Sequence, residues 1–145
     1  MKPIHILLVE DSEGDILLIR EALSESKISN TITVVKDGKL AIDFLTQKEP
    51  YETATLPNLI LLDINLPKKN GQEVLKYSKE SIKLRHIPII MLTTSSSKKD
   101  INNAYNNHVN CFITKPVDVN EFMNAVTRIE NFWTNIVQLP KGEIL

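Results

Sequence analysis

The stretch LILLDINLP, residues 59–67, joins four consecutive apolar residues to an aspartate and a short segment that ends in proline. A short apolar run bounded by polar and turn-forming residues is typical of a strand buried on both faces of a sheet. Similar runs extend from Ile4 to Val9 and from Ile87 to Leu92, and weaker ones from Thr31 to Val35 and from Val109 to Ile113. The sequence therefore predicts five strands.

Segments with helical spacing lie between these strands, for example at Ile16, Ile19 and Leu23, where apolar residues recur three or four positions apart. Helix starts are indicated where a capping side chain stands three residues before an acid: Ser12 with Asp15, Ser97 with Asp100, and Asp118 with Glu121. We expect Asp15 to be a capping residue rather than a metal ligand. Alternating strands and helices predict an α/β fold, a doubly wound parallel sheet with helices on both faces.

Length and composition restrict the class of protein. A chain of 145 residues is long enough for one domain with one core, and a formal net charge of −1 indicates neither a nucleic-acid nor an anionic membrane partner. No stretch approaches the roughly 18 apolar residues of a membrane span. The single cysteine, Cys111, cannot form an internal disulfide and is expected to be a buried apolar residue. We therefore expect a soluble cytoplasmic protein.

Polar residues follow four of the predicted strands: Glu10 and Asp11, Asp63, Thr93 and Thr94, and Lys115. In a doubly wound sheet, ligands bind outside the carboxyl ends of the strands, so we expect these side chains to meet. Crowded carboxylates repel one another unless a cation intervenes, and oxygen ligands without Cys or His favour Mg²⁺. Such a site can hold a phosphoryl group between the metal and the Lys115 ammonium.

Four blocks at these strand ends resemble the signature blocks of response-regulator receiver domains of two-component signalling: Val9-Glu10-Asp11, Leu62-Asp63-Ile64-Asn65-Leu66-Pro67 with Gly71, Met91-Leu92-Thr93-Thr94, and Thr114-Lys115-Pro116. The resemblance implies a flavodoxin-like (βα)5 fold with strand order 2-1-3-4-5. It implies a receiver domain at residues 1–130, followed by a C-terminal helix extension and tail at 131–145. That tail, with Phe132 and Trp133, is similar to the single-domain regulators paired with cyanobacterial and other bacterial phytochromes.

The resemblance also implies the chemistry of the site. Asp63 is the expected phosphoacceptor, which attacks the phosphorus of a phosphohistidine on a histidine kinase. The expected Mg²⁺ ligands are Glu10, Asp11, the Asp63 carboxylate and the backbone carbonyl of Asn65.

Two further residues are expected to contact the phosphoryl oxygens, Lys115 through its ammonium and Thr93 through its hydroxyl. Thr93 and Phe112 occupy the positions of the family's conformational switch, and the Lys115–Pro116 bond resembles one that is usually cis in the family.

The resemblance implies a stand-alone response regulator in a phosphorelay, a phosphoprotein that is not an enzyme and signals by phosphorylation-dependent conformational change and protein contacts. An aspartyl-phosphate phosphohydrolase of the haloacid dehalogenase type is an alternative, but it needs a second aspartate where this chain has Asn65. A receiver-like binding module that phosphorylation does not regulate is another. A DNA-binding output is not expected, because only about 25 residues follow Glu121.

The C-terminal residues lead us to expect a homodimer. Apolar residues with helical spacing continue from Phe122 through Ile129 to Trp133 and Ile136, while Phe132 is left without cover. Exposed aromatic groups tend to mark an interface, so a two-fold pairing of the C-terminal helices is expected. The alternative is that the tail folds back onto its own domain.

Overall fold

Strands and helices alternate along residues 3–94 and 98–128, which a computed structural model of the chain describes. The elements are β1 (Ile4–Val9), α1 (Glu13–Ser24), β2 (Asn30–Val35), α2 (Gly38–Leu45), β3 (Leu59–Asp63), α3 (Gly71–Glu80), β4 (Ile89–Thr93), α4 (Lys98–Asn106), β5 (Cys111–Thr114) and α5 (Val119–Arg128). The predicted alternation is confirmed.

The five strands form one parallel sheet in the order β2-β1-β3-β4-β5, as the resemblance implied. The register aligns the carboxyl ends of the central strands, because Val9 pairs with Leu62 and Asp63 pairs with Leu92. Residues that follow these strands therefore gather at one edge of the sheet.

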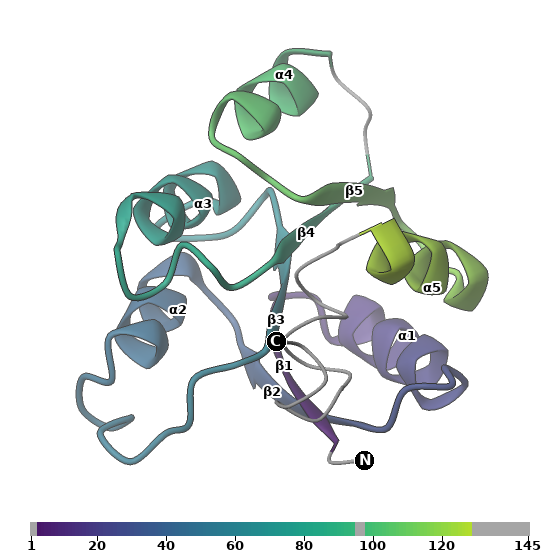
Figure 1. Cartoon of the computed structure of the whole chain (residues 1–145), viewed down its shortest axis with the longest axis horizontal. Coiled ribbons are helices and arrows are strands. Elements are labelled where there is room, and N and C mark those ends of the chain that lie inside the picture. Colours follow the sequence, from purple (N-terminus) through teal and green to yellow (C-terminus); the bar gives the residue numbers. More distant parts are fainter. Residues whose placement is uncertain (1–2, 95–97, 129–145) are drawn as a thin grey trace, which may run out of the picture.

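Helices cover both faces of the sheet, with α1 and α5 on one side and α2, α3 and α4 on the other (Figure 1). Side chains alternate between the two cores: Leu8 and Leu61 pack in the core with α1 and α5, whereas Leu7 and Leu62 pack in the other. Every residue of β3 and β4 is buried, which explains why these strands read as unbroken apolar runs.

Two of the three predicted helix caps are confirmed. The Ser12 hydroxyl accepts a hydrogen bond from the N–H of Asp15, and the Asp118 carboxylate accepts one from the N–H of Glu121. The third involves Ser97, which lies outside the described residues. Caps at Asp37 for α2 and at Asn70 for α3 were not predicted.

Two strands begin two residues later than predicted. β4 begins at Ile89, because Pro88 has no N–H to donate to a neighbouring strand. β5 begins at Cys111, because the N–H of Val109 bonds to the carbonyl of Ala104 at the end of α4.

Among the residues that the structure describes, no helix is both long enough and apolar enough to span a membrane. Cys111 is buried and free, as expected. The predicted extension and tail at residues 131–145, and the dimer contacts expected there, lie outside the described residues.

Candidate functional site

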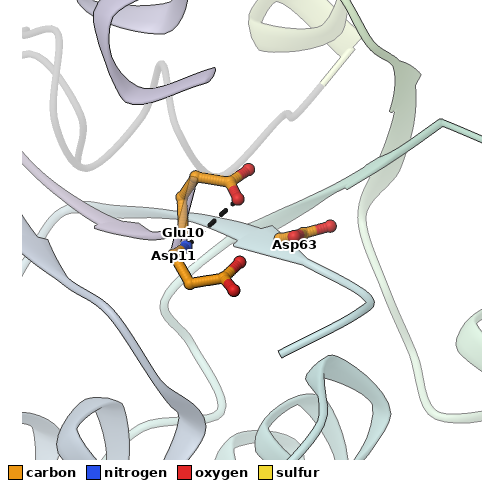
Figure 2. A group of neighbouring side chains, drawn as sticks. All are labelled: Glu10, Asp11 and Asp63. Carbon is orange, nitrogen blue, oxygen red and sulfur yellow. Dashed lines mark hydrogen bonds between the residues drawn. The ribbon is translucent and has the colours of Figure 1, made fainter. Parts of the chain in front are cut away.

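Three carboxylates converge at the carboxyl ends of β1 and β3. Glu10, Asp11 and Asp63 each offer one oxygen, and these oxygens lie within 4.8 Å of one another (Figure 2). Glu10 and Asp63 are buried, whereas Asp11 is exposed and opens the cluster to solvent. The arrangement matches the oxygen-rich donor set expected from the sequence, and hard divalent cations prefer such donors.

Glu10 is held by donors on both of its oxygens. Oε2 accepts hydrogen bonds from the backbone N–H groups of Asp11, at 3.1 Å, and Ser12, at 3.2 Å. Oε1 lies 2.5 Å from Nζ of Lys115. These three donors offset the cost of burying the Glu10 carboxylate and fix its orientation toward Asp11 and Asp63.

Lys115 reaches the cluster from the end of β5. Its Nζ lies 2.5 Å from Oε1 of Glu10, 3.0 Å from Oδ2 of Asp15 and 3.5 Å from Oδ2 of Asp63. The backbone N–H of Lys115 donates to the carbonyl of Thr93, and the Lys115–Pro116 bond is cis, as implied. One ammonium therefore contacts the acidic side chain that follows β1, one from the first turn of α1 and one that ends β3.

Asp15 differs from the expectation that it is a capping residue. Only its backbone N–H takes part in the cap of α1, while its carboxylate pairs with Lys115. The reason is tertiary: α1 lies beside α5, so its first turn faces the lysine that precedes α5.

The charges at the site shift two pKa values. Burial raises the pKa of Glu10, and the charge of Asp63 adds to this effect, while the hydrogen bond from Lys115 opposes it. Burial alone would lower the pKa of Lys115, but its hydrogen bonds to Glu10 and Asp15 and the charge of Asp63 raise it above its ordinary value. Lys115 therefore stays protonated at neutral pH. It contacts the carboxylates of Glu10, Asp15 and Asp63, and Asp11 adds a fourth carboxylate to the site, an imbalance of charge that suits a divalent cation.

The loop after Asp63 is packed against its own strand. The N–H of Gly71 donates to the carbonyl of Ile64 at 2.8 Å, and a Cβ on Gly71 would lie 2.2 Å from the carbonyl oxygen of Asp63. Only glycine allows α3 to begin this close to the site. Asn65, an expected metal ligand, is exposed in this loop, and its N–H lies 3.4 Å from Oδ1 of Asp63.

The two expected switch residues lie on neighbouring strands. Thr93 is buried at the end of β4. Phe112 on β5 is half-buried, and its ring centroid lies 6.0 Å from that of Tyr105 on α4. Their movement stays a prediction.

Gln72, which follows Gly71 in the first turn of α3, makes a contact that the sequence did not predict. Its Nε2 donates to the carbonyl of Asp100 at 3.0 Å and so links the first turn of α3 to α4. No pattern in the sequence indicates this contact.

Comparison with known proteins agrees with the fold and with the chemistry of the cluster. A family model described as the response regulator receiver domain matches residues 6–127. The response regulator Rcp1 of Synechocystis sp. is 45% identical over 138 residues, which cover 95% of this chain and 94% of the relative. The probable methanogenesis regulatory protein FilR2 of Methanothrix harundinacea is 40% identical over 131 residues, covering 90% and 84%.

Two solved structures are similar over nearly the whole chain. The Mn²⁺-bound form of Rcp1 superposes with a TM-score of 0.77 over 95% of this chain and 99% of that one. The phosphorylated cyanobacterial phytochrome response regulator RcpA, 43% identical, superposes with a TM-score of 0.78 over 97% and 100%. One relative is thus described with a divalent metal and another with a phosphoryl group.

Proposed function

The chain belongs to the response regulator receiver domain family, and from this membership we propose that Asp63 accepts a phosphoryl group from a histidine kinase. The carboxylate of Asp63 would attack the phosphorus of a phosphohistidine, forming a P–O bond as the P–N bond breaks. The electron pair of the broken bond goes to the imidazole nitrogen, which then takes a proton from solvent. The phosphoprotein would signal by changing shape rather than by acting as an enzyme.

The position of Asp63 carries this proposal. Its carboxylate lies within 4.8 Å of oxygens of Glu10 and Asp11, and 3.5 Å from the Lys115 ammonium. A phosphoryl group on Asp63 would therefore be near both a cation held by the acidic pair and a fixed positive charge. Phosphoryl transfer depends mainly on such positioning and charge compensation.

A divalent cation fits the donor set, and we propose Mg²⁺ held by Glu10, Asp11, Asp63 and the backbone carbonyl of Asn65. The cation would neutralise charge on the transferring oxygens. The Mn²⁺-bound form of Rcp1 supports a divalent cation at such a site.

Further residues have proposed roles after the transfer. Lys115 would turn from Asp63 toward a phosphoryl oxygen, and Thr93 would donate its hydroxyl to another. Phe112 would then repack against α4, where Tyr105 already contacts its ring. The surface of α4, β5 and α5 would carry the signal to protein partners.

The kinase is proposed to be of the phytochrome type, because the similarity to RcpA, a phytochrome response regulator, covers 97% of this chain. We also propose a cytoplasmic location. The receiver domain is proposed to comprise residues 1–130 and the extension residues 131–145. A homodimer through the C-terminal helix stays a prediction, and so does the absence of nucleic-acid and membrane partners.

Intact mass measurement tests the assignment of Asp63. With Mg²⁺ and a small phosphodonor, the chain should gain the mass of one phosphoryl group, and Asp63→Asn should gain none because the nucleophile is removed. Asp43→Asn on α2, which makes the same change away from the cluster, should behave as the wild type. Phosphorylation of Asp63→Asn would refute the assignment.

The same measurement separates the alternatives. A phosphohydrolase would show no stable mass gain, because it would release inorganic phosphate through many turnovers. This chain also has Asn65 where such an enzyme needs its general acid. A binding module without phosphorylation would give no mass gain in any protein.

A further inference from the structure

Strand β2 lies at an open edge of the sheet, because it pairs only with β1 in the described part of the chain. The N–H of Ile4 donates to the carbonyl of Ser29, and the N–H of Glu10 donates to that of Val35. In a parallel pair, every second residue turns its peptide groups toward the partner strand. The intervening residues Asn30, Ile32 and Val34 therefore turn theirs outward, away from β1.

This edge has none of the features that usually prevent strand pairing. Native edge strands are commonly short, charged, bulged or interrupted by proline. β2 extends over six residues with the sequence NTITVV, without a charge, a proline or a glycine. The opposite edge strand, β5, has only four residues.

The helices do not close over the edge on either face. A hollow of about 380 Å³ on the α2 face is lined by Thr31 and Thr33 together with His5 and Phe44. Another, of about 390 Å³ on the α1 face, is lined by residues that include Ile32. An added strand would thus find room for its side chains above and below the sheet.

We propose that β2 is the docking surface for a second copy of this chain, with the two β2 strands antiparallel about a two-fold axis at Ile32. This register places Ile32 opposite Ile32 of the second copy, Asn30 opposite Val34, and Thr31 opposite Thr33. The outward N–H and C=O groups of Ile32 then pair with those of Ile32 of the second copy, and those of Asn30 pair with those of Val34. The sheet thus continues through both copies.

The pairing is self-complementary in its side chains as well. β-branched residues face each other, and cross-strand pairs of this kind, including Thr with Thr, stabilise antiparallel strands. No charged side chain of β2 meets its own copy, so identical strands do not repel. A two-fold arrangement is closed, so the β2 edge itself joins two copies and no more.

Cysteine cross-linking of the full chain tests the register directly. Residues opposite each other in a hydrogen-bonded antiparallel pair have Cα atoms about 5.5 Å apart, a separation that a disulfide can span. Ile32→Cys should therefore form a covalent dimer under mild oxidation, several-fold faster than Asn102→Cys on the exposed face of α4. Cys111 is buried and should not contribute.

Sedimentation provides the second arm without a thiol and without a phosphodonor, so the result does not depend on the role of Asp63. Thr31→Lys changes an exposed side chain and should weaken self-association at least tenfold, because an edge lysine opposes strand pairing. Asn102→Lys should leave it unchanged. A wild-type chain that stays monomeric well above micromolar concentration would overturn the proposal. A dimer that survives Thr31→Lys while Ile32→Cys fails to cross-link would overturn it too, because copies would then meet elsewhere.

Discussion

Gly71 is required where α3 meets the site, and its requirement is spatial. A Cβ there would lie 2.2 Å from the carbonyl oxygen of Asp63 and 2.7 Å from Cα of Ile64, which are backbone atoms that cannot move independently. Gly14 on α1 differs, because the nearest atom to an added Cβ is 4.0 Å away. An added methyl group would therefore clash with backbone at Gly71 but not at Gly14.

Gly71→Ala should destabilise the protein by about 1–3 kcal/mol, as overpacking commonly does. Gly14→Ala should leave stability equal or raise it by up to about 1 kcal/mol, since alanine favours the helix. Urea unfolding of both variants measures the difference. Equal losses in the two variants would show that the contact at Asp63 does not constrain Gly71.

The site residues that could be predicted from sequence are those that directly follow strands. Glu10 and Asp11 follow β1, Asp63 ends β3 and Lys115 follows β5, and a parallel sheet brings the carboxyl ends of its strands to one edge. Asp15 could not be placed in this way, because its contact with Lys115 depends on how α1 lies beside the end of β5. Side chains on helices need the tertiary arrangement before their partners are known.

At the level of elements, Lys79 joins the end of α3 to the starts of two strands. Its Nζ donates to the carbonyl of Arg85 at 3.2 Å, to that of Ile87 at 3.0 Å and to Oδ1 of Asn110 at 3.1 Å. The same Asn110 oxygen accepts a bond from the N–H of Ile89. No carboxylate is among these acceptors, and burial lowers the pKa of Lys79 to about 8.

This shift predicts a pH dependence of folding. Between pH 8 and about 10.4, the usual pKa of an unfolded lysine, the unfolded chain holds a proton that the folded chain has lost. The loss of this proton from folded Lys79 should therefore raise the free energy of unfolding as pH increases across this range. Because Lys79 is partly exposed, we expect a rise of about 1 kcal/mol rather than the full value of the shift.

Urea unfolding at pH 7.5 and pH 10 measures this term as the difference between the wild type and Lys79→Met. Lys76→Met, which changes an exposed lysine on the same helix, should show no such difference between the two pH values. A wild type that loses stability relative to Lys79→Met as pH rises would mean that the three acceptors hold the ammonium more strongly than burial opposes it.

The central elements could be predicted more sharply than the edge elements, for a physical reason. β3 and β4 are buried on both faces and leave unbroken apolar runs. β2 is partly exposed, so its apolar run in the sequence is weaker. β5 begins later than predicted because the N–H of Val109 donates to a carbonyl at the end of α4 rather than to a neighbouring strand. The cap at Asp37 lacks the acid three residues later that marks the predicted caps, because Leu40 stands there, whereas Asn70 has Glu73 at that spacing and could have been predicted.

At the scale of the whole molecule, the site imposes an electrostatic cost on the fold. Glu10 and Asp63 are buried beside Asp11 and Asp15, with Lys115 as the one cation among the described residues that contacts Glu10 and Asp63. Repulsion among these carboxylates is present only when the chain is folded, because the unfolded chain separates them. A bound divalent cation would remove this repulsion, so metal binding and folding should be coupled.

Mg²⁺ should therefore raise the free energy of unfolding, by about 2.7 kcal/mol at 100 times its dissociation constant. Asp11→Asn should lose most of this increase, and without metal it should be at least as stable as the wild type, because one repelling charge is gone. Asp43→Asn on α2 should keep the full response to Mg²⁺, since its carboxylate pairs with Lys39 away from the cluster. Urea unfolding with Mg²⁺ and with a chelator compares the three proteins. If Asp11→Asn responded to Mg²⁺ as the wild type does, the cation would bind elsewhere, and the coupling between this cluster and the stability of the fold would be refuted.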